Sequence, residues 1–373
     1  MADRADRADD ERFMAQALKL AHQHLGATGS NPSVGCVIVR DDGEGQRIVG
    51  SAVTALGGRP HAETGALAVA GEAARGATAY VTLEPCSHHG KTPPCAEALI
   101  VAGIARVVVA VTDPDERVAG RGLAMLRAAG IEVVTGVLEG AGERELEAYL
   151  MRKRNNRPHV TLKLAVSADG MIGIKGQGQV RITGTPAREF VHRLRAETDA
   201  ILVGIGTAVA DDPELTVRLA GLEHRSPLRI VIDGDLDLPL TSRLVQTARN
   251  VPVMVVTGQR EGNVAFSERS RALEAAGVEV VVCDPAEPGD LLAALATRGI
   301  SSLLVEGGAR TAQTFLNAGL VDRILLFTGP STLGEQGVPS PLDRNLLPVG
   351  FVHRRTDTFG DDLLDTYEYE RAP

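Results

Sequence analysis

The sequence predicts a two-domain α/β protein in which each domain has a mostly parallel sheet covered by helices. The chain has 373 residues, more than one typical domain holds. Apolar runs of strand length alternate with segments of helical periodicity, the pattern of parallel α/β folds. The alternation stops at a basic segment ended by Pro158 and then begins again. We therefore expect one domain over residues 1–152 and a second over 158–373.

The elements of the first domain follow from periodicity and turn signals. Apolar residues recur at helical spacing over 11–25, which predicts an amphipathic first helix. The turn-like Asp41-Asp42-Gly43 separates the next two apolar runs. The expected strands are 34–39, 48–53, 78–83, 106–111 and 131–135, and the expected helices are 11–25, 61–72, 94–102, 121–129 and 139–157.

The second domain repeats the same alternation, with helices between most of its strands. The chain has no G-x-G-x-x-G motif after a strand, so the sequence does not predict a standard Rossmann dinucleotide site. The expected strands are 159–166, 199–203, 228–232, 251–256, 278–282, 301–305, 323–328 and 363–370.

Composition narrows the class of partner. No apolar run reaches the roughly 18–20 residues of a membrane span, and the polar N-terminus has no signal-peptide core, so we expect a cytoplasmic protein without membrane contact. A net charge of −9 and 3% aromatic residues argue against nucleic acid as a partner. They leave room for a small phosphorylated substrate held by a few local cations. We interpret the basic run Arg152–Arg157 as a solvated helix end and linker.

The four cysteines fall into two groups. Cys36 and Cys283 lie in or beside apolar runs, and we interpret both as buried strand residues. Cys86 and Cys95 lie close together in a chain expected in a reducing compartment, which favours metal binding over a disulfide.

A three-ligand metal site is predicted by His61, Cys86 and Cys95. One imidazole and two thiolates leave the fourth tetrahedral position of zinc open, which is typical of a catalytic rather than a structural site. Zinc lowers the pKa of its bound water towards about 7. Glu63 completes an H-x-E motif and is suited to carry the proton from this water to a departing amino group. The set matches the nucleobase deaminase signature except that eight residues, not two, separate the cysteines.

That longer loop, Pro85-Cys-Ser-His-His-Gly-Lys-Thr-Pro-Pro-Cys95, resembles the deaminase half of the bifunctional riboflavin-biosynthesis deaminase/reductases. Asn31-Pro-Ser-Val-Gly35 and Pro60-His-Ala-Glu63 fit the same family. Lys163-Leu-Ala-Val-Ser-Ala-Asp-Gly170 and Val305-Glu-Gly-Gly308 resemble motifs of its reductase half. The resemblance therefore covers nearly the whole chain.

The resemblance implies two consecutive reactions and a fold for each domain. The first domain, a cytidine-deaminase-like α/β/α sandwich, would deaminate 2,5-diamino-6-ribosylamino-4(3H)-pyrimidinone 5′-phosphate with one zinc ion. The second, similar to dihydrofolate reductase, would use NADPH to reduce the ribosyl group of the product to a ribityl chain. We also expect a homo-oligomer.

The resemblance also implies site residues. Two positions depart from the family's usual residues, Arg181 in place of tryptophan and Gly234 in place of serine, and both would touch the cofactor. Expected substrate contacts are Asn31, His88, Lys91, Lys163, Gln179, Arg195, Leu215, Arg218 and Glu306; expected cofactor contacts are Ala165, Asp169, Arg181, Thr207, Asp211, Gly234, Gly308, Ala309, Arg310, Thr311, Ala312, Gln313 and Thr314.

Two other functions remain open at this stage. One is a deaminase of tRNA or of a free nucleoside, which the acidic charge and the second α/β domain disfavour. The other is a second domain that only binds or oligomerises, which a reductase assay with NADPH would test.

Overall fold

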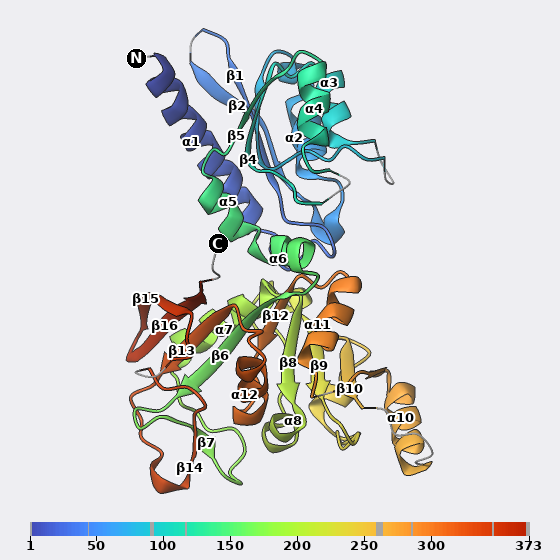
Figure 1. The fold of residues 1–373 in the computed structure, drawn as a ribbon, viewed down its shortest axis with the longest axis vertical. Helices are drawn as coiled ribbons and strands as arrows, with labels where there is room; N and C mark the ends of the chain where they lie inside the picture. Colours follow the sequence, from blue (N-terminus) through green and yellow to red (C-terminus); the bar gives the residue numbers. More distant parts are fainter. Residues whose placement is uncertain are drawn as a thin grey trace. The chain divides into compact units, whose positions relative to one another are not determined.

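Two separate sheets organise the chain in the computed structural model (Figure 1). The structure describes residues 2–43, 45–89, 93–115, 118–258, 264–284, 286–344 and 347–370. The chain divides into two compact units, Met1–Asn155 and Asn156–Pro373. Within the described part, every helix is too short or too polar to span a lipid bilayer.

The first unit is a five-stranded sheet with helices on both faces, in the order β2-β1-β3-β4-β5. β1 is antiparallel to both of its neighbours, whereas β3, β4 and β5 are parallel. The first helix packs tightly on the sheet, because a Cβ on Gly35 would lie 1.9 Å from the Ala17 carbonyl oxygen. The elements are α1 (Ala2–His22), β1 (Gly35–Asp41), β2 (Gln46–Val53), α2 (Ala62–Ala70), β3 (Thr78–Leu83), α3 (Cys95–Val101), β4 (Arg106–Val111), α4 (Arg121–Ala128), β5 (Glu132–Thr135), α5 (Glu139–Glu145) and α6 (Glu147–Asn155).

The second unit is a nine-stranded sheet in the order β11-β10-β9-β8-β12-β6-β13-β16-β15. Its strands pair in parallel except at one edge, where β16 is antiparallel to both of its neighbours, β13 and β15. β7 (Met171–Ile174) and β14 (Gly337–Pro339) form a separate small sheet. The other elements are β6 (His159–Val166), α7 (Thr185–Ala196), β8 (Ala200–Gly204), α8 (Ile205–Asp211), β9 (Leu228–Ile232), α9 (Arg243–Gln246), β10 (Val253–Thr257), α10 (Val264–Ala276), β11 (Glu279–Val282), α11 (Pro288–Thr297), β12 (Ser302–Val305), α12 (Ala309–Asn317), β13 (Arg323–Thr328), β15 (Phe351–Phe359) and β16 (Asp362–Tyr369).

The α/β class and every strand expected from the sequence are confirmed, and several details differ. The helix expected over 139–157 is two helices, because Leu146 leaves helical geometry between α5 and α6. The first helix begins at Ala2 rather than at residue 11. Cys36 is buried in β1 as expected, but Cys283 is only half-buried and follows β11 rather than lying in it.

In both units, polar residues follow the carboxyl ends of parallel strands. In the first unit Glu84 follows β3 and Asp113 follows β4, its parallel neighbour. In the second unit β12 pairs with β8 on one side and with β6 on the other, so the segments that follow these strands meet at one edge. Ligand sites of α/β sheets form at such edges.

Candidate active sites in the two units

The predicted metal ligands converge in the first unit. His61 immediately precedes α2, Cys86 lies in the loop after β3, and Cys95 is the first residue of α3. Their ligand atoms all lie within 4.8 Å of one another. Nδ1 of His61 is 3.3 Å from the Cys95 Sγ and 3.7 Å from the Cys86 Sγ.

This geometry fits a zinc ion. With Zn–N and Zn–S bonds of about 2.0 and 2.3 Å, tetrahedral ligand atoms lie about 3.6 Å apart. The backbone N–H of Cys95 donates to the Cys86 sulfur at 3.3 Å. A hydrogen bond from the Cys95 thiol, together with those from His61 and the Cys95 backbone, lowers the pKa of Cys86 to about 4. Cys86 is therefore available as a thiolate, the form that binds metal.

Glu63 lies beside this triad in the first turn of α2. Its side chain is buried, and burial together with the charge of Cys86 raises its pKa to about 7. A carboxyl group with a pKa near neutrality both accepts and releases protons at physiological pH. Glu63 is thus suited to general acid–base chemistry next to a metal.

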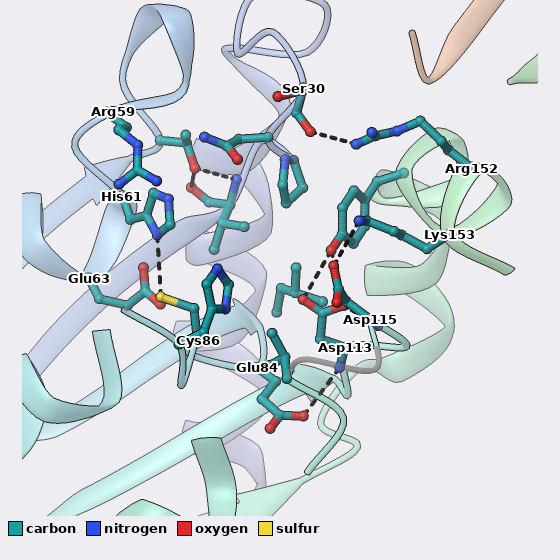
Figure 2. Close-up of a pocket in the computed structure, with 18 residues that line it drawn as sticks. Ser30, Arg59, His61, Glu63, Glu84, Cys86, Asp113, Asp115, Arg152 and Lys153 are labelled. Carbon is teal, nitrogen blue, oxygen red and sulfur yellow. Dashed lines mark hydrogen bonds and ion pairs between the residues drawn. The ribbon is translucent and has the colours of Figure 1, made fainter. Parts of the chain in front are cut away.

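His61, Cys86 and Glu63 line a cavity of about 300 Å³ (Figure 2). Asn31 and His88, both expected to contact substrate, lie in its wall. The Asn31 amide donates to the Gly58 carbonyl at 2.9 Å, and Nδ1 of His88 is buried without a hydrogen-bond partner among the described residues. Lys91, the third expected contact, lies outside the described residues.

One polar wall of this cavity, which the sequence did not predict, is made by Asp113, Asp115 and Tyr149. The Tyr149 hydroxyl lies 3.0 and 3.1 Å from the two carboxylate oxygens of Asp113, and the Asp115 backbone N–H donates to the same carboxylate. Burial raises the pKa of Asp113. The signal was present in the sequence, since Asp113 and Asp115 directly follow a predicted parallel strand.

Glu84 fixes the loop that carries these aspartates. Its buried carboxylate accepts the backbone N–H groups of Asp113, Gly120, Gly122 and Leu123 at 3.0–3.4 Å. A carboxylate that accepts several backbone N–H groups holds a loop in one conformation. Glu84 therefore positions one wall of the cavity.

The basic run at the end of α6 is not only a solvated helix end, as its sequence suggested. Arg152 and Lys153 line the cavity, and Lys153 pairs with Asp115 at 2.7 Å. Only tertiary structure brings α6 next to the loop after β4, so local composition could not reveal this.

The second unit brings three predicted substrate residues together. Val305 of β12 pairs with Leu162 of the neighbouring strand β6. Glu306 directly follows Val305, and Lys163 directly follows Leu162. The Arg195 guanidinium donates to both carboxylate oxygens of Glu306 at 2.8 and 2.9 Å.

Charge coupling keeps this cluster ionic despite its burial. Burial would raise the pKa of Glu306, but Arg195 and Lys163 outweigh it and lower that pKa to about 2. Burial lowers the pKa of Lys163, and Glu306 partly opposes this effect. A buried lysine with a lowered pKa beside a fixed carboxylate is typical of functional sites.

The remaining predicted substrate contacts are more dispersed. Arg195 also donates to the Thr216 carbonyl at 3.2 Å, which ties it to the loop of Leu215 and Arg218. Leu215 is buried with a φ of 55°, an unusual conformation for leucine. Arg218 is exposed and pairs with Glu214, and Gln179 is exposed in the loop after β7.

Three of the expected cofactor residues lie in segments that follow parallel strands: Thr207 after β8, Gly234 after β9 and Gly308 after β12. The Thr207 hydroxyl accepts the Gly308 backbone N–H at 2.9 Å and so fixes the start of α12. Hydrogen bonds from Ser167, Gly334 and Leu333 lower the pKa of Asp169 to about 2. Ala309, Arg310, Thr311, Ala312, Gln313 and Thr314 all lie in α12; Gly234 follows β9, Ala165 lies in β6, Asp211 ends α8, and Arg181 is exposed.

Comparison with known proteins finds relatives for both units. The model of the family described as the RibD C-terminal domain matches residues 158–364, and that of the cytidine and deoxycytidylate deaminase zinc-binding region matches residues 7–111. The riboflavin biosynthesis protein RibD of Escherichia coli is 42% identical over 341 residues, which are 87% of this chain and 89% of the relative.

Two solved structures resemble the whole chain. One is Acinetobacter baumannii RibD, with a TM-score of 0.86 and 35% identity over 98% of this chain and 100% of that one. The other is a diaminohydroxyphosphoribosylaminopyrimidine deaminase/5-amino-6-(5-phosphoribosylamino)uracil reductase of Thermotoga maritima, with a TM-score of 0.84 and 32% identity over 98% and 99% of the chains.

Proposed function

The chain belongs to the RibD family of riboflavin biosynthesis proteins, and on that premise we propose which of its residues carry the two reactions. It is a bifunctional enzyme with a zinc-dependent deaminase in its first unit and an NADPH-dependent reductase in its second. The first site hydrolyses the ring amine of 2,5-diamino-6-ribosylamino-4(3H)-pyrimidinone 5′-phosphate. The second reduces the ribosyl group of the deaminated product.

In the deaminase site, His61, Cys86 and Cys95 hold the metal. Bound zinc supplies the electrostatic activation that makes water nucleophilic near neutral pH. Glu63 takes a proton from the attacking water and delivers it to the amine as ammonia leaves. Asn31 and His88 orient the pyrimidine from the cavity wall; the buried Nδ1 of His88, which has no hydrogen-bond partner among the described residues, supports this role. Lys91 adds a cation from the loop between the thiolates.

In the reductase site, Lys163 and Glu306 face the ribosyl group. In the reduction a hydride adds to the sugar carbon bonded to nitrogen, the bond from that carbon to the ring oxygen breaks, and a proton goes to the released oxygen. NADPH supplies the hydride when bound. Lys163 donates or stabilises the proton, because its lowered pKa eases release. Arg195 holds Glu306 in position. The substrate contacts are completed by Gln179, Leu215 and Arg218. The cofactor is held by residues of α12 together with Ala165, Asp169, Arg181, Thr207, Asp211 and Gly234.

One observation carries the proposal: two ligands of the metal triad, His61 and Cys86, and the buried carboxyl group of Glu63 line one cavity. A coupled assay tests it. The protein is given the diaminopyrimidine phosphate and NADPH, and both ammonia release and NADPH oxidation are followed. We expect ammonia release without NADPH, and NADPH oxidation only after it. Turnover of cytidine or adenosine in place of this substrate would sink the proposal, and ammonia release without any NADPH oxidation would favour a second unit that only binds.

We further propose a cytoplasmic homo-oligomer. β15 ends the sheet of the second unit, so its outer edge has no strand partner within the described residues. Unpaired sheet edges are natural sites for pairing with another chain. Light scattering after size exclusion tests this, and a monomeric mass at micromolar concentration would contradict it.

A further inference from the structure

The end of α6 lines the deaminase cavity, although its sequence alone suggested a linker. Arg152 and Lys153 lie in the cavity wall, on the opposite side of the pocket from His61, Cys86 and Glu63 in Figure 2. The leaving amine must lie at Glu63 and the metal ligands, so the rest of the substrate extends into the remaining cavity. Its ribosyl phosphate is carried by a different ring carbon from the amine.

The lysine and arginine side chains that line this cavity are Arg59, Arg152 and Lys153, and Asp115 of the wall holds the ammonium of Lys153. Asp113 is hydrogen-bonded by the Tyr149 hydroxyl, and burial raises its pKa. Asp115 accepts Lys153 at 2.7 Å, with 24% of the lysine side chain and 9% of the aspartate side chain exposed. An ammonium group has three donors, and Asp115 occupies one of them. The Tyr149 ring, 5.8 Å away, is the other contact of this ammonium in the described part of the chain.

We propose that Lys153 binds the 5′-phosphate of the deaminase substrate, with Asp115 holding the ammonium in place. The proposal rests on the deaminase function proposed above and adds a specificity determinant to it. Lys153 would make the first reaction select a phosphorylated substrate, the form that the second reaction also uses. A lysine is suited to this role because its ammonium group binds phosphate as a compact positive charge.

The test compares two substrates and two neighbouring residues. Deaminase kinetics are measured with the phosphorylated diaminopyrimidine and with its dephosphorylated counterpart, for wild type, Lys153→Met and Arg154→Met. Arg154 is a matched control because it lies on the same helix, pairs with Glu143 and is 49% exposed. Zinc content and binding of the deaminated, phosphorylated product by calorimetry provide readouts independent of turnover.

We expect Lys153→Met to raise KM for the phosphorylated substrate about ten- to a hundredfold, the loss of one charge-assisted hydrogen bond. Product binding should weaken by a similar factor. KM for the dephosphorylated substrate, kcat and zinc content should stay near wild type, and Arg154→Met should change none of them.

Other results would overturn the inference. An equal loss on both substrates would mean that Lys153 only supports Asp115, and no loss on either would show that Lys153 does not bind the phosphate. If Lys153→Met does not fold, Lys153→Gln preserves a hydrogen bond to Asp115 and should show the same phosphate-specific loss. A wild-type protein that deaminates neither compound would refute the proposed function itself, a result distinct from failure of the Lys153 assignment.

Discussion

At the scale of single residues, Glu63 combines burial with a position next to the metal ligands. We propose that Glu63 transfers protons and does not bind the metal, so a variant can test the two roles separately. Glu63→Gln should retain zinc and lose deaminase kcat by about 10²- to 10⁴-fold, because the amide cannot carry protons. Zinc analysis and ammonia release on the same sample check this.

The second reaction provides the internal control for that variant. Reductase turnover of the deaminated product should match wild type, because the reductase cluster lies in the other unit. Deaminase turnover near the wild-type rate would contradict the proton-transfer role, and loss of zinc would show that Glu63 supports the ligands.

Asp322 is a residue whose buried charge should affect stability. It accepts two hydrogen bonds from Arg157 at 2.7 and 2.8 Å and one from the Val160 backbone at 2.9 Å. Burial alone would raise the pKa of Asp322, but Arg157 and His159 outweigh this and lower it. Asp322→Asn should cost about 3–5 kcal/mol at pH 7, because it leaves a buried guanidinium unpaired.

The pH dependence of that difference has a defined sign. A lowered pKa in the folded state means that ionised Asp322 stabilises the fold above the unfolded value of about 3.9. This stability is lost as the pH falls below about 4 towards the folded pKa, so the gap between wild type and Asp322→Asn should narrow there. Urea denaturation at pH 7, 5 and 3.5 measures it. Asp357→Asn, at a more exposed pair, is the control, and a gap independent of pH would contradict the assignment.

At the scale of elements, Glu84 links the end of β3 to the loop between β4 and α4. Its carboxylate accepts the backbone N–H groups of Asp113 and Gly120 in that loop and of two residues in the first turn of α4, Gly122 and Leu123. Glu84→Gln turns an NH₂ group towards some of these donors. We expect it to destabilise the first unit by about 2–3 kcal/mol and to raise the deaminase KM, because Asp113 and Asp115 lose their fixed positions.

Glu132 offers the matched control for this element. It is 65% exposed and pairs with Arg106, so Glu132→Gln should cost less than about 1 kcal/mol. Thermal unfolding and deaminase kinetics of both variants are compared. Equal stability of Glu84→Gln and wild type would show that the loop does not depend on the carboxylate.

At the scale of the whole molecule, the two sites use residues from different units of the chain. A chain inactivated in one site should therefore complement a chain inactivated in the other. An equimolar mixture of Glu63→Gln and Lys163→Met should oxidise NADPH from the diaminopyrimidine phosphate, although neither variant does so alone. The measurement is NADPH absorbance over time.

The rate of that mixture also reports how the intermediate travels. Free diffusion predicts a lag that shortens as enzyme concentration rises. Failure of the mixture, while each variant keeps its remaining single activity, would show that the intermediate passes between sites without release and that the sites do not act independently.

The sequence by itself determined the α/β class, the positions of the main strands along the chain and the metal triad. Each depends on local signals: apolar runs with helical or strand periodicity, and residue types at fixed spacing such as His61 and Glu63. Elements and boundaries that lack such local signals were not predicted. β15 is exposed along most of its length and has no apolar run, and Leu146 interrupts a pattern that reads as one helix.

Only the tertiary structure decided which distant polar residues share a site. Glu84, Asp115 and Lys153 lie in separate segments and meet because parallel strands place their carboxyl ends together and α6 packs beside them. The same packing brings Lys163 next to Glu306 across neighbouring strands. Side-chain pairing between segments depends on strand order and register, which residue types along the chain do not encode locally.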